Sequence, residues 1–206
     1  VSGVKMSKSL GNVISPYELL DKHGVDAMRV YMTSTTAGED ISFSWDELKL
    51  KYKNLSILWN VHKYLINYCK NFEIKPKLDV KKLDLEEKYI LSRLHSTIKT
   101  LTEYMEEYKI DLVPGLIEKL FLDLSRVYIQ FTRDKVNEKP EVVLGTLYEV
   151  LMESTKLLSI LAPFISEKIY LNLKEEFGLK EMSVHHCKWP KANEKLIDKE
   201  LERNFE

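Results

Sequence analysis

The sequence predicts a mainly α-helical protein: a helical bundle preceded by a lysine-rich loop and short connecting helices. In two long stretches, residues 84–108 and 144–161, apolar side chains recur at alternating three- and four-residue steps, the spacing of one helix face. Pro114, Pro140 and Pro163 stand near the starts of predicted helices, where proline suits the first turn. Amphipathic helices with short connections favour a bundle, because each apolar face needs a neighbouring helix to cover it.

Helix start signals divide the N-terminal part of the chain. Ser15 to Glu18 form a capping-box pattern with proline at the first helical position, and Gly24 is expected to stop this short helix. A second short helix is expected from Asp26, as its cap, to Met32. Another capping-box pattern, Ser44 to Glu47, begins a long helix that runs to about residue 72.

The remaining elements are bounded by the same proline, glycine and capping signals. They are, in order, a lysine-rich exposed loop over 73–83, helices over 84–108, 111–137, 140–161 and 163–177, an extended segment over 183–189 and a terminal helix over 193–205.

Composition excludes several classes of protein. With 206 residues, 44% of them apolar, the chain is long enough to bury a full core. The formal net charge of −1 argues against a dedicated nucleic-acid-binding protein, so any RNA site must be a local patch. Cys69 and Cys187 give no disulfide framework, which fits a cytoplasmic location. No apolar run approaches membrane-spanning length, so we expect no membrane partner.

The segment Lys5 to Ser9 carries the strongest functional signal. Two lysines three positions apart, separated by a hydroxyl and flanked by Gly3 and Gly11, predict a mobile loop that brings two ammonium groups onto one polyphosphate. Phosphoryl and nucleotidyl transfer need positive charge where negative charge builds on a leaving group. Lysine suits a moving loop, because its compact charge sits on a flexible stem.

This segment resembles the KMSKS signature of class I aminoacyl-tRNA synthetases. Residues 11–16 and 23–29 resemble the sequence that follows the signature in the isoleucyl, valyl and leucyl enzymes. Residues 40–45 and 58–61, and residues 183–185 with Trp189-Pro190, look most like the isoleucyl branch, so the resemblance covers nearly the whole chain. The valyl and leucyl branches stay open as alternatives.

The resemblance implies roles for the loop residues. In that family the second lysine of the signature, here Lys8, contacts the ATP phosphates and stabilises departing pyrophosphate, with Lys5 assisting. We therefore expect ATP, with its Mg²⁺, to bind at Lys5 to Ser9. Ser7 and Ser9 either donate hydrogen bonds or keep the loop soluble, and Met6 is expected to anchor the loop.

The chain is expected to be part of an enzyme. The partner signature of class I synthetases, His-x-Gly-His, does not surround any of the five histidines, and the sequence begins at Val1 without methionine. We therefore predict a C-terminal portion, inactive alone, of a ligase that activates isoleucine with ATP and transfers it to tRNA. Residues 1–43 would end the catalytic domain, 44–178 would form an anticodon-binding bundle, and 179–206 would form an extended segment and a C-terminal helix.

Anticodon recognition needs planes on which bases stack, polar groups for base edges and cations for phosphates. Two predicted helices carry this mixture, and the candidate tRNA-binding residues are Asn60, Lys63, Arg126, Arg133 and Lys135. An ordinary solvated face is the alternative for the charged residues. Trp59 and Tyr128 favour core positions, because aromatic residues at helical spacing usually pack.

Two further hypotheses concern metal binding and a different class of function. His185, His186 and Cys187 suggest zinc ligands, but no paired cysteines or histidines at ligand spacing complete a site, so we predict no metal bound by this chain. A helical protein-interaction module whose loop matches by coincidence is the alternative from another class. It predicts neither ATP nor tRNA binding.

Overall fold

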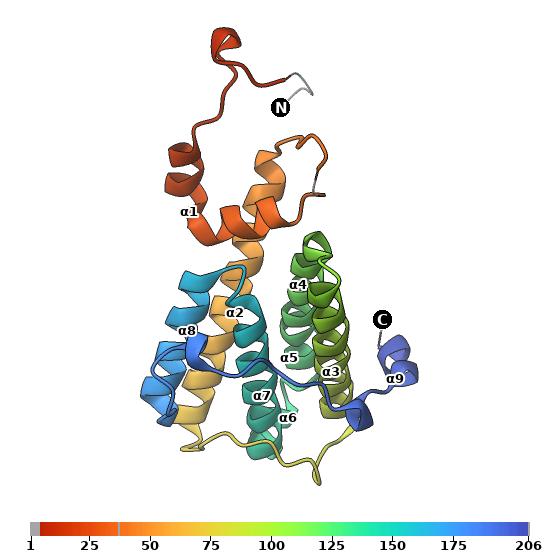
Figure 1. Ribbon diagram of the computed structural model, residues 1–206. Coiled ribbons are helices and arrows are strands. Elements are labelled where there is room, and N and C mark those ends of the chain that lie inside the picture. The colour runs from red at the N-terminus through yellow and green to blue at the C-terminus, as the bar shows by residue number, and fades with distance from the viewer. Residues whose placement is uncertain (1–4, 37, 206) are drawn as a thin grey trace.

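The computed structural model describes residues 5–36 and 38–205, and within these ranges the chain is helical without a strand. The predicted helical bundle is confirmed. Figure 1 shows the long helices side by side, with α1 lying across one end and the loop of residues 5–12 beyond it. The longer helices are α1 (Pro16–Thr33), α2 (Trp45–Asn71), α3 (Leu85–Glu106), α4 (Val113–Asp123), α7 (Pro140–Leu158) and α8 (Pro163–Phe177). The shorter ones are α5 (Ile129–Phe131), α6 (Lys135–Glu138) and α9 (Lys199–Asn204).

The predicted break at Gly24 lies inside α1. Gly24 has φ 76° and ψ 163°, a conformation that only glycine adopts without strain, so α1 bends there. The capping box predicted at Ser15 is wrong, because the Ser15 side chain makes no capping hydrogen bond and Glu18 pairs instead with Lys22 at 2.8 Å. Pro16 alone marks the helix start.

The single helix predicted over 111–137 is also wrong. A π-helical turn, Leu124–Tyr128, follows α4, and the chain then continues through α5 and α6. A π turn holds more residues than an α turn, so it shifts the register of everything after it. Tyr128, fully buried, fits this shift: its hydroxyl donates to the Val143 carbonyl at 3.2 Å and lies 3.3 Å from Glu87 Oε1. Apolar spacing alone does not reveal such a turn.

The C-terminal segment crosses the bundle. In Figure 1, residues 179–198 pass over α7 and α3, and α9 lies against α3. The Glu202 carboxylate, 4% exposed, accepts hydrogen bonds from Ser92 Oγ at 2.6 Å and Ser96 Oγ at 2.5 Å, which fixes α9 on α3. The extended segment predicted over 183–189 contains a 3₁₀ turn, Val184–His186. The terminal helix predicted over 193–205 is a 3₁₀ turn, Glu194–Leu196, followed by α9.

A buried ion-pair network joins α3 to α6. Glu87 is completely buried, and Lys135 Nζ lies 2.6 Å from its carboxylate and 3.0 Å from those of Asp84 and Glu86. Burial alone would lower the pKa of Lys135, but the hydrogen bonds that it donates to these carboxylates raise the pKa above its ordinary value. Lys135 is therefore charged and paired inside the protein.

Replacing Lys135 with alanine is expected to destabilise the chain by about 3–5 kcal/mol, because Glu87 would stay buried without its counter-ion. Lys139→Ala is the matched control: Lys139 also pairs with Asp84, at 2.8 Å, but its side chain is 52% exposed. We expect the control to change stability by less than about 0.5 kcal/mol. The measurement is urea unfolding of both variants, and equal losses would contradict the structural role of Lys135.

Candidate active-site loop and RNA-binding face

The loop of residues 5–12 is held by the Asn12 side chain. Asn12 Oδ1 accepts a hydrogen bond from the Ser7 N–H at 2.7 Å, and its Nδ2 donates to the Lys5 carbonyl at 3.2 Å. The Leu10 N–H donates to the Ser7 carbonyl at 3.1 Å, and Gly11 turns the chain with φ 64°. The loop therefore closes on its own backbone. This role of Asn12 was not predicted from the sequence, although asparagine commonly bonds to nearby backbone in turns.

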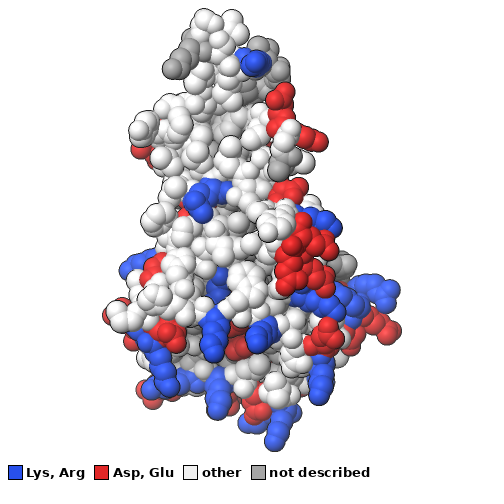
Figure 2. Space-filling model, viewed as in Figure 1, with Lys and Arg blue, Asp and Glu red and all other residues white. Residues whose placement is uncertain are grey.

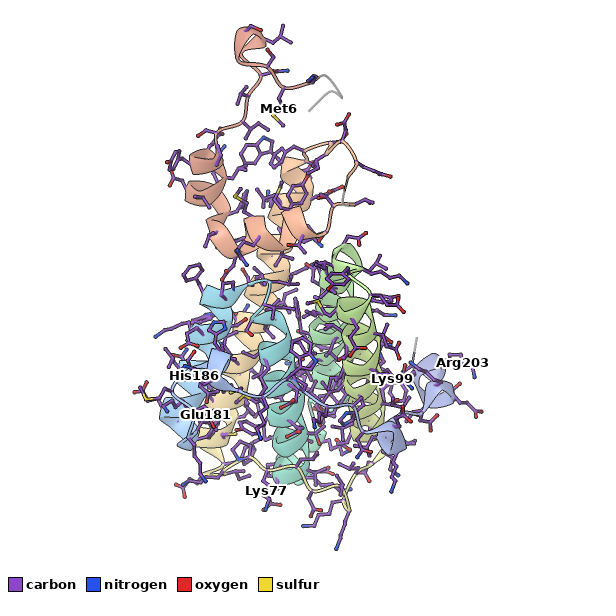
Figure 3. The ribbon with its side chains drawn as sticks, in the orientation of Figure 1. Met6, Lys77, Lys99, Glu181, His186 and Arg203 are labelled. Atoms are coloured by element: carbon purple, nitrogen blue, oxygen red, sulfur yellow. The ribbon has the colours of Figure 1, made fainter. Side chains whose placement is uncertain are left out.

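The predicted loop residues lie together at this end of the molecule (Figure 3). Lys5 is exposed, and the hydroxyls of Ser7 and Ser9 are hydrogen-bonded to each other at 2.7 Å. Met6, predicted as an anchor, is 40% exposed. The backbone of Lys8 starts a 3₁₀ turn, Lys8–Leu10, while its side chain lies outside the described part of the chain.

The structure separates the predicted RNA-binding residues into two groups. Asn60 and Lys63 are exposed on α2, Arg126 is exposed on the π turn, and Arg133 is exposed just after α5. Lys135 differs, because its side chain is only 15% exposed and its charge faces three carboxylates. We therefore regard Lys135 as part of the bundle interior.

Arg133 is close enough to Tyr64 of α2 for its charge to affect the pKa of that residue. Tyr64 and Tyr68 stack with their rings 4.1 Å apart. Burial and the neighbouring Tyr68 raise the pKa of Tyr64, and the positive charge of Arg133 opposes that rise. Tyr64 and Tyr68 are not among the predicted RNA-binding residues, although two tyrosines four residues apart on a helix face are visible in the sequence.

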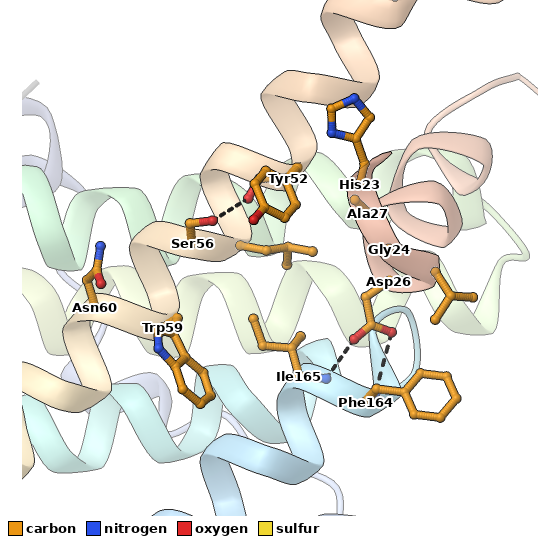
Figure 4. A pocket seen from close by; sticks show the side chains of 12 residues that line it. His23, Gly24, Asp26, Ala27, Tyr52, Ser56, Trp59, Asn60, Phe164 and Ile165 are labelled. Atoms are coloured by element: carbon orange, nitrogen blue, oxygen red, sulfur yellow. Dashed lines mark hydrogen bonds between the residues drawn. The ribbon is translucent and has the colours of Figure 1, made fainter. Parts of the chain in front are cut away.

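Two hollows lie along α2, and Trp59 lines both. The first, about 460 Å³, is an open hollow lined by residues of α1, α2 and α8, with Tyr52, Asn60 and Phe164 in its wall (Figure 4). The second, about 310 Å³, lies between α2 and α8 and is lined by more polar side chains. These include His62, Lys63, Asn67, Lys70, Asn172 and Glu176. Trp59 is half-buried, at the edge of the core rather than inside it.

His62 forms the inner wall of the second hollow. It is 1% exposed, its ring stands edge-on to Trp59 with centroids 4.3 Å apart, and its Nε2 lies 3.0 Å from Asn172 Nδ2. Burial lowers the pKa of His62 from its ordinary value of 6.5, so the imidazole is neutral at pH 7.

Charge is unevenly distributed over the face in Figure 2, where most blue and red atoms cover the bundle and the loop-bearing end is largely white. No helix in the described ranges has both the length and the apolar character to cross a membrane. Among the same residues, no cluster of three or more histidine, cysteine, aspartate or glutamate side chains is placed to hold a metal ion. His185 and His186 are exposed, and burial raises the pKa of the Cys69 thiol to about 12.

Comparison with known proteins assigns the class. Residues 87–206 match the family described as the anticodon-binding domain of tRNA ligase, and residues 1–44 match class I tRNA synthetases for isoleucine, leucine, methionine and valine. The chain therefore belongs to the class I aminoacyl-tRNA synthetase family, in the part that carries the anticodon-binding domain.

Isoleucyl-type enzymes are among its relatives. An isoleucine–tRNA ligase from Methanosarcina barkeri is 39% identical over 97% of this chain and 20% of its own, and a valine–tRNA ligase from Pyrococcus horikoshii is 37% identical over 98% of this chain and 23% of its own. A LeuRS structure from Agrobacterium radiobacter K84, a ternary complex with tRNA and LeuAMS, superimposes with TM-score 0.71 at 22% identity. It covers 95% of this chain and 23% of that one, and shows the same fold. The chain spans about a fifth of the length of the isoleucine relative.

The neutral state of His62 leads to a pH prediction. In the unfolded chain histidine binds a proton near pH 6.5, whereas desolvation lowers the pKa values of buried His62 and half-buried His95. Below about pH 6.5 the unfolded state therefore binds more protons, and stability falls as the pH decreases. We expect His62→Gln to show a smaller fall than the wild type between pH 7.5 and 5.5 in urea unfolding. Identical pH slopes would contradict the burial of a neutral His62.

Proposed function

We propose that this chain acts within an isoleucine–tRNA ligase, which activates isoleucine with ATP and transfers it to tRNA(Ile). One observation carries the proposal: a single chain joins a Lys5-to-Ser9 loop to a tRNA-ligase anticodon-binding domain and resembles isoleucine–tRNA ligase over 97% of its length. Valine specificity is the second candidate, because a valine–tRNA ligase is 37% identical. The family match argues against a protein-interaction module with a coincidental loop. A cytoplasmic location accords with the two free thiols.

We propose three functional segments. Residues 1–43 would end the catalytic domain, 44–178 would form the anticodon-binding bundle, and 179–206 would brace it. The class I synthetase match, which ends at residue 44, supports a division near the start of α2, and the anticodon-binding match begins in α3, at residue 87. Glu202, fixed on α3, supports a bracing role for the last segment.

The proposed reaction places Lys5 and Lys8 at the leaving group. The isoleucine carboxylate attacks the α-phosphorus of ATP, an oxygen–phosphorus bond forms, and the bond from the α-phosphorus to the bridging oxygen breaks. Pyrophosphate leaves with the electron pair, so negative charge grows on the β,γ side. Lysine ammonium groups held there stabilise the transition state more than the ground state, and Mg²⁺ enters with ATP as its counter-ion.

The proposed tRNA-binding face keeps Asn60, Lys63, Arg126 and Arg133. Lys63 and Arg126 have no ion-pair partner within the described residues, so their charges remain available to phosphates. Tyr64 and Tyr68, beside Arg133, add aromatic surface. Lys135, originally predicted with this set, is left out because its carboxylate partners already neutralise it.

Lys8→Ala in the full-length ligase is expected to lower isoleucine-dependent exchange of pyrophosphate into ATP by about 10²–10³-fold, the usual effect of losing one preorganised electrostatic donor. Isoleucine affinity should change little. The 206-residue chain alone is expected to give no exchange above a heat-killed control. Unchanged exchange in the variant would exclude Lys8 from catalysis, and exchange by the isolated chain would contradict a partial enzyme.

Replacing Lys63 and Arg133 together with alanine is expected to weaken tRNA binding and flatten its salt dependence, since each phosphate contact contributes nearly one unit of slope. The control replaces Lys191 and Lys195, two exposed lysines on the C-terminal segment. Both double variants should unfold within about 0.5 kcal/mol of wild type. The measurement is tRNA affinity across a salt series. Parallel slopes for both variants would show that Lys63 and Arg133 form only a solvated face.

A further inference from the structure

One turn of α1 binds both sides of the break between α7 and α8. Asp26 is 9% exposed, and its carboxylate accepts hydrogen bonds from the Ile165 N–H at 2.6 Å and the Phe164 N–H at 3.4 Å (Figure 4). These N–H groups belong to the first turn of α8, where no helical carbonyl can accept them. The Ala162 side chain that precedes α8 offers no cap, so Asp26 supplies one from 139 residues away.

Arg29, three residues further along α1, completes the contact. Its Nε donates to the Leu161 carbonyl at 2.9 Å, and its Nη2 lies 3.4 Å from the Ile160 carbonyl. These carbonyls follow the C-terminal end of α7, where helical partners are missing. Asp26 binds donors and Arg29 binds acceptors, so their charges match the opposite polarities of the two helix ends.

The position of this contact links the two functional ends of the protein. Toward the N-terminus, α1 begins four residues after Asn12, which closes the loop of Lys5. Beyond the contact, α8 forms one wall of the hollows that Trp59 lines. The N-terminal half of α1 also packs on α2, with the rings of His23 and Tyr52 5.7 Å apart. The orientation of α1 on the bundle is therefore fixed by its contacts with α2 and with the start of α8.

We propose that Asp26 and Arg29 are positioning residues, which fix the loop-bearing segment on the bundle so that tRNA docked on the bundle meets a correctly placed active site. The inference rests on the proposed function. A misplacement of about 1 Å far from the chemistry can cost about 10²-fold in rate, and α1 lies between the bundle and the loop. Losing this contact would reduce the rate of transfer to tRNA without removing any group that touches tRNA.

The test compares Asp26→Ala with Asp198→Ala in the full-length ligase. Asp198 caps α9 by accepting from the N–H groups of Glu200 at 3.1 Å and Leu201 at 2.9 Å, so both variants lose a helix cap of the same chemistry. We expect Asp26→Ala to lower kcat for aminoacylation of tRNA(Ile) about 10- to 10²-fold, with tRNA Kd within about twofold of wild type. Asp198→Ala should leave both constants unchanged.

Two additional variants test whether the hydrogen bonds of Asp26 and Arg29 are responsible for the effect. Asp26→Asn retains an oxygen acceptor, and asparagine caps helices as well as aspartate does, so it should restore most of kcat. Arg29→Ala should lower kcat, and adding it to Asp26→Ala should cost less than the product of the single effects, because the two residues act as one unit.

Equal losses in Asp26→Ala and Asp198→Ala, or a kcat that follows only the folded fraction measured by thermal unfolding, would overturn the inference. A raised tRNA Kd in Asp26→Ala with unchanged kcat would also overturn it. If wild-type ligase fails to charge tRNA, the proposed function fails, whereas normal charging with an inert Asp26 rejects the positioning role alone.

Discussion

The position of α1 on the bundle depends on one constraint: the backbone groups at the C-terminal end of α7 and at the N-terminal end of α8 lack helical partners. A break between two buried helices exposes N–H and C=O groups that must find partners, because a buried polar group without one is costly. The turn after α8 meets this need locally, since Lys174 Nζ donates to the carbonyls of Leu179 at 3.1 Å and Glu181 at 2.7 Å. The break before α8 is satisfied instead from α1, so completing the bundle also determines where α1 sits.

Besides Asp26, three further buried carboxylates need donors from other segments of the chain. Glu87, Glu118 and Glu202 are 0%, 6% and 4% exposed, and each receives hydrogen bonds or ion pairs from another part of the chain. Glu118 of α4 is bound by Lys51 and Asn54 of α2, with Asn54 Nδ2 at 3.1 Å. A buried charge loses its water on folding and depends on the donors that the fold places around it. Breaking one of these pairs therefore destabilises the protein more than breaking an exposed ion pair does. Apolar stripes bring the helices together, and each carboxylate adds a polar contact between two particular segments: α3 with α6, α4 with α2, and α9 with α3.

Features that depend on residues close together in the sequence could be predicted, whereas features that depend on residues far apart in the sequence could not. The break at Gly24 and the helix starts at Pro16, Pro140 and Pro163 depend on local backbone chemistry, and the structure has all of them. The lysine loop was likewise identified by resemblance. The cap that Asp26 provides could not be predicted, because its partners are 138 and 139 residues away and the residue sits where a local cap is equally plausible. Gly145 is similar: a side chain there would collide with the Lys77 carbonyl, which only the packing of α7 on the 73–83 loop reveals.

Charge shows most clearly why the site was harder to predict than the fold. The chain has 31 lysine and arginine residues against 32 acidic ones, so composition alone gives no RNA-binding surface. Which cations remain available is decided by folding: Lys135 is neutralised by three carboxylates, and Lys70 pairs with Glu176 at 2.9 Å. Lys63, one turn of α2 before Asn67, keeps its charge exposed at the rim of the hollow beside Trp59. In a nearly neutral chain, the exposed cations that remain available are therefore those, such as Lys63, that the fold does not place against a carboxylate.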